Sequence, residues 1–366
     1  MSKLKNRYLS LDVFRGLDVA LMIIVNSPGR GSTTFSPLLH AEWNGFTLTD
    51  LVFPTFLFVV GNSMSFSMKK YESMGNPAFF KKVLKRTAII FLLGFLMYWY
   101  PFFDDGQLKP FSETRVFGVL QRIALCYMFA SIILHFVKTK TAIWLSVSFL
   151  VGYHLILIGF GDLSLAGNAV LKLDEWLIGG NHMYHGNGIA FDPEGLLSTL
   201  PAIVNVIIGY LAGRFIQNNG QNFETVAKLM MVGFALIFVG LAWDLILPIN
   251  KKLWTSSFVM LTCGIDLFAI AILIYILDMK KAKSWSYFFE VFGKNTLFIY
   301  LLSELFVISL YAIDVNGESL YRWIADNLFI SWSGGYMGSL LFALWVMLTC
   351  WFVGYIMDKR GVYVKV

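Results

Sequence analysis

The side chain best suited to acid–base chemistry is His40, in the segment VNSPGRGSTTFSPLLHAEWNGFTLTD that covers residues 25–50. An imidazole accepts and returns a proton near neutral pH. In the same segment, Asn26 could donate a hydrogen bond to a developing oxyanion, and Asp50 could orient the imidazole. A lone histidine in a loop is more often a bystander, and the spacing alone leaves both interpretations open. We predict that His40, Asn26 and Asp50 form the catalytic set.

A second polar pair, Gln121 and Arg122, lies inside the apolar stretch FGVLQRIALCY. Ionisable groups within a lipid-embedded segment are costly unless they are paired or line a wet cavity. The guanidinium fork of Arg122 suits a carboxylate, a phosphate or an amide carbonyl. A structural partner such as Asp50 or Glu304 is as plausible as a ligand.

Two cationic residues, Arg15 and Lys294, are expected on the side of the membrane opposite to His40, where they could meet an anionic ligand. Asp12 and Arg15 are three residues apart, so they either pair with each other or form a charged mouth. Lys294 and Asn295 occur in GKNTLFIY. Lys294 either meets ligand phosphates or simply extends to the membrane interface.

The segment HMYHGNGIAFDPEG, residues 182–195, contains both histidines and carboxylates. His182 and His185 have an H-x-x-H spacing that could bind a metal, but Gly- and Asn-rich loops also form sugar-binding lids. We favour the lid and predict no metal, with Asp192 and Glu194 contacting substrate. Glu194 is also typical of the start of a helix, where acidic residues are favourable.

A further candidate segment is PINKKLWTSSFV, residues 248–259, which combines Trp254, Ser256 and Ser257 with two lysines. We expect it at the outer mouth of a membrane-spanning helix. Lys251 and Lys252 are interpreted as ordinary solvated charges of a loop.

The elements that must position these residues are transmembrane helices. The 366 residues are 57% hydrophobic and only 14% charged, against about a quarter charged in a soluble domain. Apolar runs of about 20 residues recur along the chain, and each is long enough to cross a bilayer. The net charge of +6 arises from short clusters between these runs, which argues against nucleic-acid binding. Cys126, Cys263 and Cys350 fall inside apolar runs and are expected to be small buried hydrophobes.

We therefore predict an all-α, polytopic integral membrane helix bundle, with residues 1–366 as one transmembrane domain. The pattern of apolar runs indicates about ten spans, near residues 11–27, 50–68, 84–100, 116–137, 141–160, 195–215, 225–247, 253–277, 288–312 and 335–357. About 19 cations fall on one side of these spans and about seven on the other, so the positive-inside rule places both termini in the cytoplasm. Residues 161–194 are then an extracytoplasmic loop.

The chain also resembles a known family. The stretches SLDVFRGLDVALMIIVNSPG and LLHAEWNGFTLTDLVFPTFLFVVGNS, with FGVLQRIALCY, FDPEGLLSTLPAI, LPINKKLWTSSFV and GKNTLFIYLLSE, resemble the heparan-alpha-glucosaminide N-acetyltransferase family and its bacterial relatives. The resemblance implies that cytosolic acetyl-CoA acetylates a glucosamine across the membrane, with His40 as the catalytic histidine. Asn26 matches the family's asparagine, although the loop between the two residues is slightly longer here than in the animal enzyme.

The animal enzyme also carries a large lumenal domain and an extra span that this sequence does not contain. We therefore expect a bacterial-type member in the inner membrane that acts on small amino sugars or cell-envelope glycans, with a homodimer unsurprising by analogy. Two other functions stay open: O-acetylation of a cell-envelope polysaccharide, and transport of sugars or organic anions. The sequence shows no matched pair of broken helices of the kind that transporters use.

The expected mechanism places the pantetheine arm of acetyl-CoA in the bundle, with its phosphates near Arg15 or Lys294 and its thioester beside His40. His40 acts either as a general base or as a transient acetyl carrier, while Asn26 or Arg122 stabilises the oxyanion. The predicted acetyl-CoA-binding residues are Arg15, Arg122, Gln121, Asn44, Trp43, Ser256, Ser257, Lys294 and Asn295. The predicted substrate-binding residues are Asp192, Glu194, Trp254 and Glu304.

Overall fold

A computed structural model describes residues 8–71, 75–104 and 106–364 and shows an almost entirely helical protein. The side chains of Lys70 and Asp104 are not described. Several cations that entered the orientation argument, namely Lys3, Lys5, Arg7 and Lys365, lie outside the described residues. The placement of the termini therefore stays a prediction.

Each of the ten predicted apolar runs lies in helical structure. The long elements are α1 (Leu9–Asn26), α2 (Leu48–Tyr71), α3 (Asn76–Trp99), α4 (Val119–Phe136), α5 (Thr139–Phe160), α7 (Thr199–Asn219), α8 (Phe223–Asp244), α9 (Ser256–Leu273), α10 (Ser286–Lys294), α11 (Thr296–Ala312) and α14 (Gly335–Lys359). Within the described ranges, seven helices are long and apolar enough to cross a bilayer, or eight if α10 and α11 count as one. The integral membrane class is thus supported, and the count of ten stays a prediction.

The short elements connect the long helices. They are 3₁₀ turns η1 (Gly31–Thr33), η2 (Ser36–Leu38), η3 (Phe111–Glu113) and η4 (Gly180–His182), helices α6 (Ala169–Ile178), α12 (Leu320–Ile324) and α13 (Ser331–Ser333), and π-helical turns η5 (Ile274–Met279) and η6 (Ala325–Ile330). Two antiparallel hairpins pair β1 (Phe103–Asp104) with β2 (Gln107–Leu108), and β3 (Asp314–Val315) with β4 (Glu318–Ser319). The predicted 161–194 loop therefore contains a helix, α6, whose first turn is capped by the side chain of Asn168.

The helix predicted over 288–312 is broken in two, because the chain bends by 85° between α10 and α11. The bend falls at Asn295, whose side chain is hydrogen-bonded to the backbone that follows α14 rather than to a helix. Its Nδ2 donates to the carbonyl of Val362 at 3.0 Å, and its Oδ1 accepts from the amide of Val364 at 2.9 Å. A continuous apolar run does not reveal such a break.

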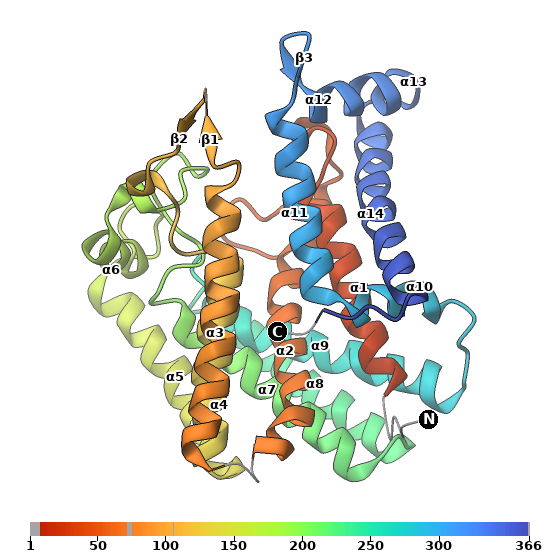
Figure 1. Cartoon of the computed structure of the whole chain (residues 1–366). Helices are drawn as coiled ribbons and strands as arrows, with labels where there is room; N and C mark the ends of the chain where they lie inside the picture. Colours follow the sequence, from red (N-terminus) through yellow and green to blue (C-terminus); the bar gives the residue numbers. More distant parts are fainter. Residues whose placement is uncertain (1–7, 72–74, 105, 365–366) are drawn as a thin grey trace.

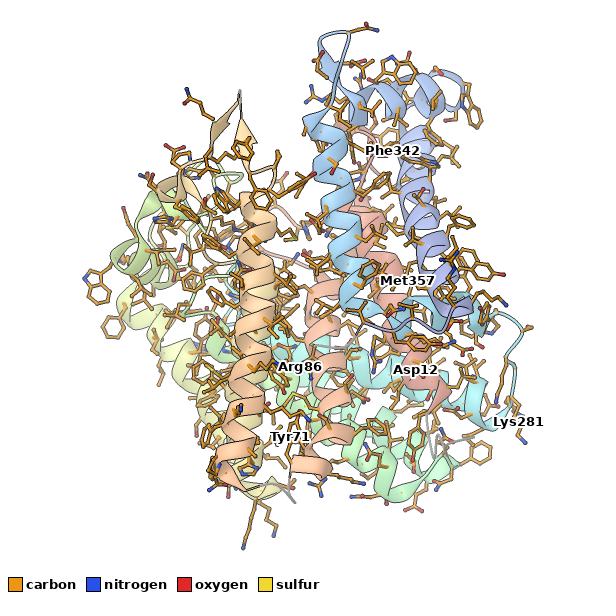
Figure 2. The ribbon with its side chains drawn as sticks, viewed as in Figure 1. Asp12, Tyr71, Arg86, Lys281, Phe342 and Met357 are labelled. Atoms are coloured by element: carbon orange, nitrogen blue, oxygen red, sulfur yellow. The ribbon has the colours of Figure 1, made fainter. Side chains whose placement is uncertain are left out.

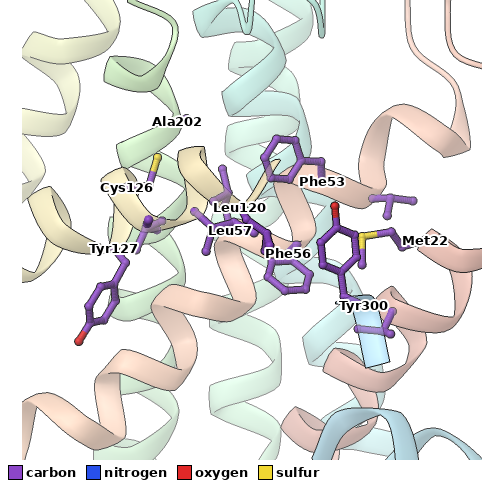
Figure 3. Close-up of a cluster of buried hydrophobic side chains, with 14 of the residues drawn as sticks. Met22, Phe53, Phe56, Leu57, Leu120, Cys126, Tyr127, Ala202 and Tyr300 are labelled. Carbon is purple, nitrogen blue, oxygen red and sulfur yellow. The ribbon is translucent and has the colours of Figure 1, made fainter. Parts of the chain in front are cut away.

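The helices pack around α2, which contacts α1, α4, α7 and α9. Figure 1 shows α1, α11 and α14 on one side of the bundle and α3, α4 and α5 on the other. In the core, Phe53, Phe56 and Leu57 of α2 lie between Leu120 of α4 and the ring of Tyr300 from α11 (Figure 3). All three cysteines are buried and free, which confirms their expected role as small hydrophobes.

Two glycines bring α1 and α10 into backbone contact. A Cβ atom on Gly16 would overlap the carbonyl oxygen of Phe289, and a Cβ atom on Gly293 would overlap the carbonyl oxygen of Asp12. Figure 2 shows Asp12 beside this end of α10. Only a residue without a side chain fits at either position.

Candidate active site

The segment between α1 and α2 folds so that His40 faces Asp50 in the first turn of α2. Nδ1 of His40 lies 2.8 Å from Oδ1 of Asp50. Oδ2 of Asp50 accepts from the amides of Ala41 at 3.1 Å and Thr47 at 3.0 Å. The Asp50 side chain is 1% exposed and that of His40 is 45% exposed. A fixed carboxylate therefore orients an accessible imidazole, as the sequence predicted; its catalytic use stays a prediction.

Lys251, from the connection between α8 and α9, lies against the same imidazole. Its Nζ is 3.1 Å from Nδ1 and 3.2 Å from Nε2 of His40. Loss of surrounding water and the charge of Lys251 lower the pKa of His40, although Asp50 opposes this shift. Burial also lowers the pKa of Lys251, while Glu194 and Asp50 act in the opposite sense. The interpretation of Lys251 as a solvated loop charge was therefore wrong.

Arg115 holds two carboxylates at the end of the 161–194 segment, Asp192 and Glu194. Its Nε and Nη2 donate to Asp192 at 2.9 and 2.7 Å, and Nη2 also donates to Glu194 at 2.6 Å. The guanidinium stacks on the rings of Tyr98 and Tyr184 at 4.8 and 4.9 Å. Arg115 was not among the predicted site residues; its signal in the sequence was an arginine in a segment with few cations, two residues before FGVLQR.

Glu194 does not start a helix, which corrects the alternative interpretation of Asp-Pro-Glu. The following helix, α7, begins at Thr199. Although burial favours the neutral form, Arg115, Arg122 and Lys251 together hold the pKa of Glu194 below its usual range. Glu194 is therefore an anion that interacts electrostatically with Lys251 beside the imidazole.

Arg122 is fully buried and binds the chain just before α7, rather than Asp50 or Glu304 as suggested. It donates to the carbonyl of Gly195 at 3.0 Å and to the hydroxyl of Ser198. Its guanidinium lies 4.9 Å from the ring centre of Trp254. Within the described chain, Nε and Nη1 of Arg122 and both polar atoms of Gln121 are buried without a hydrogen-bond partner. Such groups are rare in proteins, and each requires an explanation.

Trp254 forms the floor under Arg122 in an uncommon backbone conformation. Its φ of 52° lies in the left-handed region, which bulky residues rarely adopt. The indole donates to Oδ1 of Asn205 at 3.1 Å, and the ring packs edge-on against Phe53 and Phe258. Strain of this kind clusters at functional sites.

Asn26 and Glu304 form a separate polar pair between α1 and α11. Nδ2 of Asn26 donates to Oε1 of Glu304 at 3.2 Å. The sequence assigned these residues to different roles, an oxyanion donor and a substrate ligand. The structure brings the two together.

Four other predicted ligands are bonded to neighbouring loops and helices. Trp43 donates to the carbonyl of Leu163 at 2.8 Å, and Asn44 accepts from Asn250 at 3.1 Å. The hydroxyls of Ser256 and Ser257 are buried and donate to backbone carbonyls, each at 2.7 Å. These contacts favour a role in holding the outer loops, and cofactor binding by the four residues stays a prediction.

His182 of the H-x-x-H pair also has a backbone partner. Its Nδ1 lies 2.8 Å from the carbonyl oxygen of Thr114. This contact fixes the loop against the segment that carries Arg115. The interpretation of residues 182–195 as a sugar-binding lid rather than a metal site stays a prediction.

Arg15 and Lys294 lie on two helices in contact, α1 and α10. Arg15 donates to the hydroxyl of Ser63 at 2.7 Å and to the carbonyl of Gly293 at 3.1 Å, and it pairs with Asp12 at 3.6 Å. Lys294 pairs with Asp358 at 2.9 Å. Ser63 is 13 residues beyond Asp50 on α2, which corresponds to about 20 Å along a helix. Arg15 therefore meets α2 about 20 Å from Asp50, eight residues before the helix ends at Tyr71.

Comparisons with known proteins agree on one family. A family model described as "Heparan-alpha-glucosaminide N-acetyltransferase, catalytic" matches residues 7–247. Two curated proteins named heparan-alpha-glucosaminide N-acetyltransferase are similar to the chain. The protein of Mus musculus is 28% identical over 362 residues, covering 82% of this chain and 54% of its own length. That of Homo sapiens is 28% identical over 368 residues, covering 84% and 54%. The chain thus spans about half the length of these relatives.

Proposed function

The chain belongs to the heparan-alpha-glucosaminide N-acetyltransferase family, and from this membership we propose that it transfers the acetyl group of acetyl-CoA to the amino group of a glucosamine-type sugar. The donor enters from the cytoplasm and the acceptor from the other side of a bacterial inner membrane. The observation that carries the proposal is the 2.8 Å contact between Nδ1 of His40 and Oδ1 of Asp50, with the imidazole accessible.

The His40–Asp50 contact sets the direction of proton transfer. If Nδ1–H donates to Asp50, Nε2 keeps its lone pair and faces the acceptor as a base. Nε2 takes a proton from the sugar nitrogen as that nitrogen attacks the thioester carbonyl. A carbon–nitrogen bond forms, the carbon–sulfur bond breaks, and the thiolate of CoA leaves and is protonated. The competing route, acetylation of His40 itself before the sugar reacts, uses the same lone pair.

The groups around the imidazole fit an amino-sugar acceptor. Glu194 is held as an anion that interacts electrostatically with Lys251, and an anion favours a sugar ammonium before its proton is removed. Asp192, the ring of Trp254 and the Asn26–Glu304 pair extend the acceptor site. The unpartnered donors of Gln121 and Arg122 are suited to the acetyl oxygen, whose negative charge grows in the transition state.

Donor binding uses the length of the bundle. Arg15, Lys294 and Asn295 meet the phosphates of CoA, and the pantetheine arm covers the distance along α2, about 20 Å, to His40. Trp43, Asn44, Ser256 and Ser257 position the outer loops around the thioester. We propose that one domain of ten spans holds this site and that the protein forms homodimers. With its phosphates at one side and its thioester at the other, acetyl-CoA itself would extend across the hydrophobic layer.

The test is transfer of label from acetyl-labelled acetyl-CoA by the purified protein to three acceptors: glucosamine, a glucosamine-terminated oligosaccharide, and glucose. We expect label on the amines alone, and a fall in turnover of about 10²-fold or more for His40→Ala with CoA binding retained. His135→Ala is the control, because His135 stacks on Phe79 away from Asp50. Preferential labelling of glucose would indicate O-acetylation instead. Sugar flux into liposomes without acetyl-CoA would indicate transport.

A rapid-quench experiment without acceptor separates the two chemical routes. Label trapped on His40 supports the acetyl-imidazole route. Release of label only when glucosamine is added, with none on the protein, supports direct transfer.

A further inference from the structure

Two cations of α3 are stacked on buried tyrosine rings in the half of α3 that is predicted to lie toward the cytoplasm. The guanidinium of Arg86 lies 4.6 Å from the ring centre of Tyr127 in α4, and Nζ of Lys82 lies 4.9 Å from that of Tyr71 at the end of α2. The phenol of Tyr127 interacts electrostatically with both Tyr71 and Arg86. The four side chains therefore form one group, the cation–tyrosine cluster, and Figure 2 shows Arg86 and Tyr71 between the ribbons of α3 and α2.

Arg86 has no carboxylate partner in the described part of the chain. Its Nε is buried without a hydrogen-bond partner, as is the hydroxyl of Tyr127. Neither α3 nor α4 contains an acidic residue, and Asp50, the one in α2, comes 21 residues before Tyr71. The next acidic residue, Glu72, lies outside the described residues.

Other cations near the ends of the spans are neutralised within the chain. Their carboxylate partners are Asp12 for Arg15, Asp192 and Glu194 for Arg115, and Asp358 for Lys294. An ionisable side chain at the edge of a span that the fold does not pair in this way is suited to an anion from outside the chain.

The arrangement of the two cations fits the shape of a phosphate. Lys82 and Arg86 are four residues apart on α3, so their Cβ atoms are about 6 Å apart on one face of the helix. A guanidinium can bind two oxygens of one phosphate, and an ammonium binds a further oxygen as a point charge. The tyrosine rings attract both cations without neutralising their charge. The rings therefore orient the cations and leave them available to an anion.

The cluster lies at a level where phosphate groups are expected. Arg86 comes ten residues after the start of α3, about 15 Å along the helix, and two residues inside the predicted span 84–100. Lys82 lies just outside that span and is exposed. The predicted boundary between the cytoplasm and the hydrocarbon layer thus passes through the cluster.

We propose that the cation–tyrosine cluster binds an organic phosphate at the predicted cytoplasmic face, with the phosphate oxygens on Arg86 and Lys82. Two sources supply this chemistry, the headgroup of an anionic phospholipid and the phosphates of CoA. The site goes beyond the proposed function, which places the donor phosphates at Arg15 and Lys294. CoA carries phosphate both in its diphosphate and on its ribose, so a second cationic site is compatible with that placement.

The test measures binding to the full-length protein in detergent, with no acceptor present. The probes are CoA, dioleoyl phosphatidylglycerol and, as the lipid without net charge, dioleoyl phosphatidylcholine. Calorimetry measures CoA binding, and native mass spectrometry measures lipid binding. The double variant Lys82→Gln/Arg86→Gln should bind CoA or phosphatidylglycerol about 10-fold or more weakly than the wild type. The matched control Lys81→Gln/Lys85→Gln has the same charge change on exposed residues of α3 and should bind as the wild type does.

The two probes separate the two sources of phosphate. Loss of CoA affinity alone identifies the donor as the source, and loss of the preference for phosphatidylglycerol alone identifies a lipid; either result supports the site. A wild type that binds neither probe, a double variant that keeps both affinities, or an equal loss in the control would overturn the proposal.

A milder variant separates binding from folding. Arg86→Lys keeps the charge but removes the guanidinium fork, so it should bind the phosphate more weakly than the wild type and more tightly than Arg86→Gln. Its thermal unfolding midpoint in detergent should stay close to that of the wild type. Wild-type affinity in Arg86→Lys would contradict the proposal. None of these measurements uses acetyl transfer: a wild type that binds no CoA would contradict the proposed function, and the lipid probes would still test this site.

Discussion

The ammonium of Lys251 lies within 3.2 Å of both ring nitrogens of His40, so a cation borders the nitrogen that must act as a base. The imidazole is therefore influenced by Lys251, by Asp50 and by Glu194, which the fold collects from the α8–α9 connection, from the start of α2 and from the segment before α7. The protonation of His40 is therefore determined by several neighbouring charged groups together.

Replacing Lys251 by methionine should change the pH dependence of acetyl transfer. Removing a nearby positive charge makes the imidazolium easier to form, so the pKa of His40 rises. The acid limb of the kcat/KM profile should then move to higher pH. Lys252→Met is the matched control, because Nζ of Lys252 binds Asn187 at 2.8 Å instead. Identical profiles for the two variants would show that Lys251 does not control the base.

Replacing Asp50 by asparagine should lower kcat by about 10²- to 10⁴-fold, because the imidazole loses the partner that fixes its tautomer. Binding of CoA, whose phosphates we propose to lie about 20 Å away near Arg15, should be unchanged. Thr47→Val serves as the control: its hydroxyl donates to Oδ2 of Asp50 at 3.1 Å, so removing it weakens the support but keeps the carboxylate. Turnover near the wild-type value in Asp50→Asn would refute the orienting role.

Arg115 should be essential for stability. Arg115→Gln leaves the buried carboxylates of Asp192 and Glu194 without their cation, which destabilises a protein by about 3–5 kcal/mol. The exposed pair between Arg30 and Asp326 provides a comparison, and Arg30→Gln should cost about 0–1 kcal/mol. Thermal unfolding in detergent measures both.

Adding Asp192→Asn and Glu194→Gln to Arg115→Gln should restore part of the lost stability, because the uncompensated charges disappear. A triple variant as unstable as the single one would mean that packing of Arg115 on Tyr98 and Tyr184, rather than its charge, is what matters.

Asp174 should make stability depend on pH between about 4 and 7. Burial raises the pKa of this α6 carboxyl to about 7, although Oδ1 accepts from the amide of Leu196 at 2.9 Å. In this range the folded state keeps a proton that the unfolded state has released, so stability falls as pH rises, by about 1.4 kcal/mol per unit for one full proton. Asp174→Asn should remove that slope from the unfolding midpoints measured between pH 5 and 8. An unchanged slope would place its origin elsewhere.

Much of the fold follows from the apolar runs, because a span must satisfy its backbone within itself and so must be helical. Two features do not follow. The bend at Asn295 is accompanied by hydrogen bonds between its side chain and the backbone of residues 362 and 364, which no local pattern reveals. Helix α6 lies in a segment whose glycines and histidines suggest a loop, yet Asn168 caps it and Asp174 ties it to residue 196.

The candidate site could be predicted in part. His40 and Asp50 were found because their residue types and their positions around the start of a helix suit a base and its partner. Arg115 and Lys251 were not, because a loop cation looks the same in sequence whether it is solvated or held against a carboxylate or an imidazole. The predicted partners of Arg122 were wrong because the guanidinium binds a backbone carbonyl, that of Gly195. The sequence does not indicate which backbone group a side chain will bind.

The backbone contact of α1 with α10 at Gly16 and Gly293 has a consequence far from the imidazole. A single methyl group at either glycine would act as a wedge, since the opposing atom is a carbonyl oxygen that cannot rotate away. Arg15 is the neighbour of Gly16 and is bonded to the carbonyl of Gly293, so the wedge would displace this guanidinium from its anchor. Two alanine substitutions, chemically silent in themselves, would thus disturb the proposed donor site at Arg15, far from the contact between His40 and Asp50.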